Sequence, residues 1–429
     1  MEQAVMQQSR SIPWWKRLGA GLVTGAADDD PSGIATYSQV GAAYGYGMLW
    51  TVLLALPLMI GIQAVSARVG RVTGAGLAKN LRSEFPVPLV AGAVILLAIA
   101  NVINLSADIG AIGAAAKLLA GGPAPLYAAL AAILSVLLQV FIPLERYSPV
   151  LKILTLSLLA YLVTVAVLHV PWLTVAKETV WPTITMKADY AVAIVAVLGT
   201  TISPYLFFWQ SSQEANEIKT TTHRKPLKKA PRQAPRAMKR IYIDTVVGML
   251  FSEVVAFCII LVAAAVLHAH GKTNVQTSAD AAMALRPLAG KFAFLLFATG
   301  IIGTGLLAIP VLAGSVAFAL GETFNWRTGL EQKPARAKLF YGAIVAATIG
   351  GMVLSFTPMD PIKMLFWSAV INGVVAVPLM VLIMLLASRR KTMGKFPIPL
   401  WLKYLGWAAT AAMGAATAVM IVTSFITRH

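Results

Sequence analysis

An acidic run interrupts the first apolar stretch of this sequence. It reads Asp28-Asp29-Asp30-Pro31, and Gly33 follows two residues later. Proline lacks the amide hydrogen that a helix uses and clashes with the preceding turn, while glycine allows unusual backbone angles. A helix that unwinds here frees carbonyl oxygens, which lipid tolerates only where they face protein, water or an ion. Carboxylates beside free carbonyls predict an oxygen-rich cation site.

The three aspartates are not equivalent in this prediction. A carboxylate left unpaired in a membrane costs roughly several kcal/mol. The alternative to an ion site is that the aspartates cap a helix at the membrane edge. Asp30 lies roughly a dozen residues into the apolar stretch, and that depth argues for the site. Asp28 and Asp29 belong either to the site or to an aqueous vestibule.

A second apolar stretch is interrupted in a similar way. Its break runs from Gly199 through Thr200 to Ser203-Pro204-Tyr205. Thr200 can offer a carbonyl oxygen, and Ser203 a hydroxyl or a carbonyl. Hydroxyls in membrane helices often bond only to their own backbone, so this signal gains weight mainly from its pairing with the first break.

Polar residues also follow one face of a third apolar stretch. Asn101, Asn104 and Asp108 stand at i, i+3 and i+7, which is one helical face. They indicate either a wet pathway for ions or a hydrogen-bonded seam between helices. Glu253 and Asn372, each inside an apolar stretch, are further pathway candidates.

The surrounding sequence is that of a polytopic membrane protein. It has 429 residues, of which 58% are hydrophobic and 12% charged, about half the charged share of a soluble domain. Stretches of roughly 20 apolar residues, the length that crosses a bilayer, recur from end to end. We expect eleven helical spans, at about 17–44 (interrupted), 47–67, 88–119, 124–142, 149–168, 189–212 (interrupted), 241–267, 291–319, 338–356, 362–387 and 401–425.

Basic residues alternate between the loops. They gather before the first span and in every second loop after it, most densely in 214–240, whereas most of the opposite loops are short or nearly neutral. The positive-inside rule then places the N-terminus in the cytoplasm and the C-terminus outside an inner membrane. Because the net charge of +18 sits in loops, nucleic acid is not an expected partner. We expect 214–240 to be a basic cytoplasmic loop that is flexible over 223–236, either a topology signal or a contact for anionic headgroups.

The two interrupted spans are the first and the sixth, five spans apart. The second group of five therefore begins on the opposite side of the membrane, which is the pattern of an inverted repeat with a midplane site between two broken helices. We divide the chain into a cytoplasmic tail, two repeats and a last helix, at 1–16, 17–168, 189–387 and 401–425. No removable signal peptide is expected.

Several motifs resemble the NRAMP divalent-metal transporters. They are Asp30-Pro31-Ser32-Gly33, similar to that family's Asp-Pro-Gly-Asn, then Gln63 to Gly70 with Thr73-Gly74, Ser106 to Gly110, and Ala313-Gly314-Ser315. The resemblance covers nearly the whole chain. It implies an all-α LeuT-type fold with a 5+5 inverted repeat and a metal bound between helices 1 and 6. Asp30 would be the main ligand, Ala27 and Thr200 would give carbonyls, and Ser203 and Gly33 would shape the cavity.

The sequence departs from that family at metal-binding and proton-carrying positions. The family's asparagine falls on Gly33, its sixth-helix methionine on Ser203 and its histidine on Tyr205, while a glutamate and a glutamine fall on Ala111 and Ala369. Thioether sulfur favours transition metals, whereas carboxylate, carbonyl and water suit Mg²⁺ and Mn²⁺, and Mg²⁺ usually keeps several waters. The pattern is similar to the NRAMP-related magnesium transporters, which lack proton coupling.

The sequence thus predicts a carrier that takes up Mg²⁺, and also Mn²⁺, by alternating access without protons. The alternatives are a proton-coupled Mn²⁺/Fe²⁺ importer in which Asp30 and Asp108 carry the proton, an amino-acid carrier of the same fold, and a metal sensor. Aspartates at the break would repel a substrate carboxylate, and no regulatory domain is visible. Without a phosphate-binding loop or a nucleophile with its base, neither an enzyme nor a cofactor is expected. The expected partners are divalent ions and the lipid bilayer, with no obligatory protein partner.

Overall fold

The structure is a computed structural model that describes residues 24–25, 27–142, 156–185, 187–221 and 223–426. These residues form helices, turns and loops without strands. The long helices are α3 Pro31–Tyr44, α4 Leu49–Thr73, α6 Val87–Ala120, α7 Ala124–Phe141, α11 Ala188–Thr201, α12 Pro204–Thr220, α13 Ala234–Val266, α16 Ala293–Thr323, α17 Lys338–Ser355, α18 Pro361–Ser388 and α20 Leu400–Ile426. Shorter helices are α5 Leu77–Glu84, α9 Leu159–Val167, α10 Trp172–Val180, α14 Ser278–Ala282, α15 Arg286–Ala289 and α19 Arg390–Met393.

The helices have the length and composition of membrane spans. In the described part of the chain, 9 helical stretches are long and apolar enough to cross a bilayer, or 10 if the bent pair Leu156–Val167 and Trp172–Val180 is one span. The stretch Pro31–Thr73 is 43 residues long, about twice what one crossing needs. It turns at Gly45, where φ is +59°, so it holds parts of the first and second expected spans. The all-α, multi-span prediction is confirmed, whereas the tail 1–16 lies outside the described residues.

Both predicted helix breaks are present. The first lies before α3, whose N-cap is Asp30 and whose first residue is Pro31. The second separates α11 from α12 at Ile202-Ser203, again with a proline as the first residue of the following helix. Prolines favour this position because their missing N–H would have no partner there.

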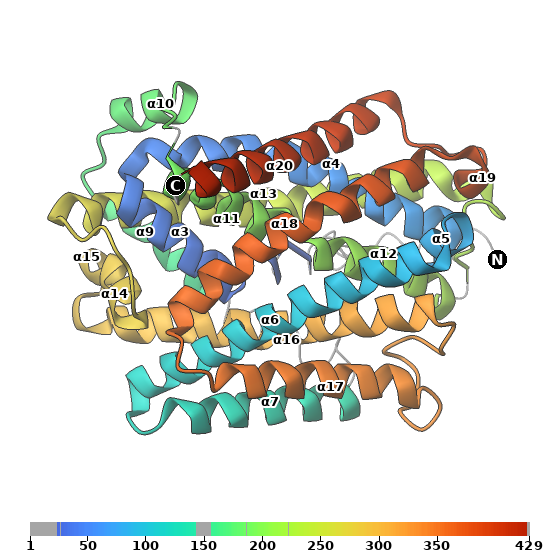
Figure 1. Ribbon diagram of the computed structural model, residues 1–429, viewed down its shortest axis with the longest axis horizontal. Coiled ribbons are helices and arrows are strands. Elements are labelled where there is room, and N and C mark those ends of the chain that lie inside the picture. The colour runs from blue at the N-terminus through green and yellow to red at the C-terminus, as the bar shows by residue number, and fades with distance from the viewer. Residues whose placement is uncertain (1–23, 26, 143–155, 186, 222, 427–429) are drawn as a thin grey trace, which may run out of the picture.

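The helices run mostly along one direction and enclose the two breaks (Figure 1). α6 packs on α16, α17 and α18, and α4 packs on α12, α13 and α20. α7, α17 and α20 lie at the outside of the bundle (Figure 1) and expose large apolar side chains such as Leu130, Val353 and Phe425. Apolar outer faces of this kind suit a lipid environment.

One close approach fixes α11, the helix before the second break, against α18. A Cβ added to Gly199 would lie 2.1 Å from the carbonyl oxygen of Ala369 and 2.6 Å from the nitrogen of Gly373. The two backbones therefore touch at this point. A larger residue at 199 would push the second break away from α18.

The basic segment 214–240 differs from the free loop that we expected. α12 continues to Thr220, and α13 already begins at Ala234. Between them, the amide of Leu227 donates to the carbonyl of Arg71 at 3.3 Å, and the Leu227 side chain is buried. Backbone hydrogen bonds and a buried apolar anchor thus hold this segment against the end of α4.

Candidate metal site

The carboxylate of Asp30 is the centre of the buried polar group between the two breaks. Its Oδ1 accepts hydrogen bonds from the Ser32 hydroxyl at 2.5 Å and from the Gly33 amide at 2.9 Å. Its Oδ2 accepts from the Asn104 amide at 3.0 Å and from the Tyr205 hydroxyl at 3.3 Å. Asp30 therefore caps α3, which is one part of the alternative to an ion site. However, only 1% of its surface is exposed, so the cap is buried and does not lie at a membrane edge.

Two contacts join the first break to the second. The Tyr205 hydroxyl, on α12, lies 3.1 Å from the carbonyl oxygen of Ala27 as well as near Asp30. The Ser32 hydroxyl lies 3.3 Å from that of Thr200, at the end of α11. The predicted juxtaposition of the two interrupted helices is therefore present in the structure.

The Ser203 hydroxyl donates its hydrogen bonds within the second break. Its Oγ donates to the carbonyls of Gly199 and Thr200, both at 2.8 Å. This is the local backbone bonding that serines in membrane helices often make. A hydroxyl and a carbonyl each keep acceptor lone pairs after one such bond, so both oxygens retain the capacity to face an ion.

Gly33 leaves limited room beside the carboxylate. A Cβ at this position would meet the Tyr37 ring at 3.3 Å, the Thr200 hydroxyl at 3.4 Å and the Asp28 carbonyl at 3.5 Å. These contacts are tight to ordinary, so a Cβ atom fits if its neighbours yield slightly. The space above Gly33 is therefore bounded by the Tyr37 ring and by one oxygen atom from each break.

The polar face of α6 divides between two roles. Asn104 bonds to Asp30, and its own oxygen accepts from Asn372 of α18 at 3.5 Å. Asn101, one turn earlier, instead donates to the Ser315 hydroxyl of α16 at 2.7 Å. Asp108 is fully buried, and neither of its carboxylate oxygens has a hydrogen-bond partner among the described residues. Both asparagines thus form hydrogen bonds between helices, and the pathway interpretation of this face stays a prediction.

Asp28 and Asp29 form a second acidic group with α13. The Ser252 hydroxyl lies 2.6 Å from Asp28 Oδ2 and 3.0 Å from Asp29 Oδ1, and Glu253 interacts electrostatically with both. Each aspartate is 1% exposed and Glu253 is 3% exposed. They are enclosed by protein and do not lie in an open vestibule.

Sequence reasoning missed two members of these groups. Ser32 is part of the first motif and Ser252 directly precedes Glu253, but neither is a predicted site residue. Serines are common in membrane helices, so no spacing distinguishes these two.

Within the described ranges, no three His, Cys, Asp or Glu side chains gather closely enough to hold a metal ion together. Any ion at Asp30 would therefore bind mainly to carbonyl, hydroxyl and water oxygens.

The fold and the facing breaks define the class of this protein. A multi-span bundle with two discontinuous helices around a buried polar centre is a LeuT-type transporter fold. The family described as "Natural resistance-associated macrophage protein-like", or Nramp, matches residues 21–423, and the chain belongs to this family.

Individual relatives agree with the assignment. The chain is 27% identical over 426 residues to the "Divalent metal cation transporter MntH" of Burkholderia ambifaria, covering 95% of this chain and 89% of that protein. A manganese transporter structure from Eremococcus coleocola aligns with a TM-score of 0.73 at 18% identity, over 96% of this chain and 88% of that one. Mhp1, a nucleobase-cation-symport-1 family transporter, aligns with a TM-score of 0.59 at 14% identity, over 95% and 93%.

Proposed function

We propose that this protein carries divalent metal ions across the inner membrane, prefers Mg²⁺, accepts Mn²⁺ and does not couple transport to protons. Its metal site is proposed to consist of Asp30 with oxygens of Ala27, Thr200 and Ser203, and with Gly33 leaving space. The observation that carries this proposal is the position of Asp30, a buried carboxylate in contact with both broken helices. The names of its relatives as metal transporters support the same class.

The hydrogen bonds of Asp30 indicate which oxygen would bind the ion. A carboxylate has about four acceptor positions, and four donors occupy them here. An ion can therefore bind only if a donor yields. Oδ1 is held by the two shorter bonds, one of which caps α3, whereas Oδ2 is held at 3.0 and 3.3 Å. We infer that Oδ2 turns to the metal and that Tyr205 yields first.

The donor set favours a hard ion. The oxygens around Asp30 are carboxylate, carbonyl, hydroxyl and amide oxygens, which suit Mg²⁺ and Mn²⁺ better than softer transition metals. Mg²⁺ requires near-octahedral coordination and releases its waters reluctantly. Because one carboxylate cannot complete such a shell, waters would supply part of it, and the Tyr37 ring and Thr200 hydroxyl that border Gly33 would have to move to admit them.

The membrane potential suffices to drive this uptake. Moving two charges through −100 mV is worth about 4.6 kcal/mol, at about 2.3 kcal/mol per charge. The proposed orientation has the N-terminus in the cytoplasm and the C-terminus outside, with 17–168 and 189–387 as inverted repeats. The buried acidic group of Asp28, Asp29 and Glu253 would attract cations on the approach to Asp30.

A proton-coupled Mn²⁺/Fe²⁺ importer is the second candidate. One observation favours it, since Asp108 is a buried carboxylate without a hydrogen-bond partner among the described residues and could accept a proton. Against it, the positions that carry a histidine and a glutamate in the related family hold Tyr205 and Ala111 here.

Transport by the purified protein in liposomes separates the two candidates. The liposomes would contain dyes for Mg²⁺, Mn²⁺ and internal pH, and a potassium diffusion potential would set the voltage. We expect Mg²⁺ entry that rises with negative internal potential, Mn²⁺ entry that excess Mg²⁺ inhibits, and no acidification. Acidification that follows metal entry would favour the proton-coupled importer, and Mn²⁺ entry that Mg²⁺ cannot inhibit would exclude the magnesium assignment.

A further inference from the structure

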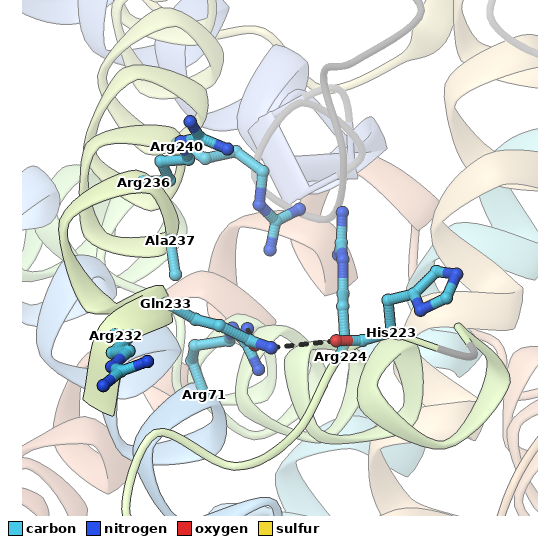
Figure 2. Close-up of a pocket in the computed structure, with 8 residues that line it drawn as sticks. All are labelled: Arg71, His223, Arg224, Arg232, Gln233, Arg236, Ala237 and Arg240. Carbon is cyan, nitrogen blue, oxygen red and sulfur yellow. Dashed lines mark hydrogen bonds between the residues drawn. The ribbon is translucent and has the colours of Figure 1, made fainter. Parts of the chain in front are cut away.

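A basic cavity lies at the end of the bundle where α4 ends and α13 begins. It has a volume of about 440 Å³ and is lined by Arg71, His223, Arg224, Arg232, Gln233, Arg236, Ala237 and Arg240. Figure 2 shows these side chains around one hollow, contributed by α4, by the segment between α12 and α13, and by the first turns of α13. We propose that this cavity is a binding site for a phosphate-bearing anion, either a free polyphosphate or the phosphate of a lipid headgroup.

The cavity is held open by contacts that do not need a ligand. The Gln233 side chain donates to the carbonyl of His223 at 2.8 Å (Figure 2) and accepts from the Arg71 guanidinium at 3.0 Å. Arg71 also donates to the carbonyl of Lys225 at 2.8 Å. Three separate parts of the chain are thus cross-linked around the hollow, so a ligand would meet a preorganised wall.

The charges around the cavity do not balance. Arg240 pairs with Glu214 at 2.6 Å and with Glu217 at 2.9 Å, and Arg224 also pairs with Glu217. Asp244 interacts electrostatically with Arg240 as well. Five arginines therefore face three carboxylates, an excess of two positive charges.

The excess resides on arginines that are available to a ligand. Arg232 and Arg236 are exposed at the rim, and neither forms an ion pair with any described acidic side chain. Arg71 is 3% exposed and bonds to neutral oxygens only. Glu214 and Glu217 interact electrostatically with Arg71 but form no hydrogen bond with it, so an anion in the cavity would give this buried guanidinium a direct charged partner.

The chemistry of the lining selects phosphate among anions. Each guanidinium presents a planar set of donors that matches two phosphate oxygens at once. The volume of about 440 Å³ lies within the range of small-molecule sites, roughly 300–1,000 Å³. A single carboxylate would use one arginine and leave the remaining excess unpaired, whereas a diphosphate or a phosphomonoester carries enough charge to neutralise it.

The test uses the full-length protein in detergent, with inorganic pyrophosphate as the probe and calorimetry as the readout. Divalent metals are omitted because they chelate pyrophosphate. We expect binding that weakens as salt is added and that is much weaker for sulfate. The double variant Arg232→Gln/Arg236→Gln should weaken pyrophosphate binding at least about tenfold, since it removes two charge-assisted contacts.

The matched control is Lys229→Gln/Lys239→Gln. It removes the same charge from exposed positions of the same segment that do not line the cavity, and it should change binding less than twofold, as expected for surface charges. Both double variants alter exposed side chains, so both should fold, and their elution profiles and melting temperatures would verify this.

A second arm identifies the source of the phosphate. The same variants are placed in nanodiscs of phosphatidylcholine with or without phosphatidic acid, and bound lipid is counted by native mass spectrometry. If the arginine variant binds less phosphatidic acid than the lysine variant, and the parent protein does not bind pyrophosphate, the ligand is a lipid headgroup. If the arginine variant loses only pyrophosphate binding, the ligand is a free anion. If neither probe binds, or if both double variants lose binding equally, the cavity is not a phosphate site.

Discussion

The two helix breaks face each other but differ in chemistry. The first has three buried carboxylates and a capped helix start at Asp30. The second has no charged group between Gly199 and Tyr205, and its hydroxyls bond mainly to its own carbonyls. The first break thus supplies charge, and the second supplies neutral oxygens and a phenol that reaches across.

This difference indicates a division of roles. Charge at one break is enough to attract a cation, because the binding energy depends on the carboxylate more than on any neutral ligand. The neutral break then controls the size and softness of the cavity. We therefore expect changes at the first break to decide whether ions are transported, and changes at the second to decide which ions and how fast.

The largest effect is expected from Asp30→Asn. The variant keeps the shape of the side chain but removes the charge that would face the ion. Losing one partner of a buried charged interaction costs roughly 2–5 kcal/mol, so Mg²⁺ transport in liposomes should fall at least about 30-fold.

Asp280→Asn is the control for that variant, because it removes a carboxylate that pairs with Lys272 far along the chain. It should transport Mg²⁺ at the parent rate. Normal transport by Asp30→Asn, in protein that elutes as a single peak, would remove Asp30 from the site and end the division of roles.

A change of metal preference is expected from Gly33→Asn combined with Ser203→Met. These substitutions restore the amide and the thioether of the related family, and a Cβ at position 33 fits with small shifts of its neighbours. Sulfur favours transition metals over Mg²⁺. The ratio of Mn²⁺ to Mg²⁺ transport should rise roughly tenfold, a difference of about 1.4 kcal/mol.

Ser203→Leu, again with Gly33→Asn, separates sulfur from bulk. Leucine is close to methionine in size but cannot bind a metal, so this variant should lose Mg²⁺ transport without gaining Mn²⁺ preference. If both double variants raised the ratio of Mn²⁺ to Mg²⁺ transport equally, cavity size and not the ligand atom would set the metal preference.

Tyr205→Phe is expected to slow transport and to leave the affinity for Mg²⁺ unchanged or slightly higher, because the long bond from Tyr205 to Asp30 must break before an ion binds. The hydroxyl joins α12 to Ala27 and Asp30 across the two breaks, so its loss destabilises the enclosed arrangement through which an ion must pass. One hydrogen bond contributes about 0.5–1.5 kcal/mol, and the maximal rate should fall roughly three- to tenfold.

Tyr341→Phe is matched to that change, since its hydroxyl also contacts two oxygens, the carbonyls of Leu330 and Gln332, but away from the breaks. It should leave the rate unaltered. If Tyr205→Phe mainly raised the concentration of Mg²⁺ needed for half-maximal transport, the hydroxyl would be a ligand and not a link between helices.

The sequence allowed the positions of both breaks to be predicted because their cause is local. Proline and glycine act on the backbone next to them, so Pro31 and Pro204 identify helix starts without any knowledge of neighbours. The helical face of Asn101, Asn104 and Asp108 was predictable for the same reason, since it depends only on spacing.

The partners of those residues were not predictable, because they depend on packing between distant helices. Asn101 and Asn104 share one face, yet one bonds to α16 and the other to Asp30. Ser252 contacts Asp28 across 224 positions of sequence, and nothing local marks it. The burial of Asp28 and Asp29 likewise results from α13, whose position is decided by the whole bundle.

The smallest effect is expected from Ser203→Ala. The hydroxyl donates to Gly199 and Thr200 within its own break, and these carbonyls can also bond to water once the site opens. Its removal leaves the charge at Asp30 untouched and frees the Thr200 carbonyl for an ion. Mg²⁺ transport should therefore change at most about threefold, within the roughly 1 kcal/mol of a neutral hydrogen bond. A loss as large as that of Asp30→Asn, measured in the same liposomes, would mean that the neutral break supplies an essential ligand and that charge alone does not select the site.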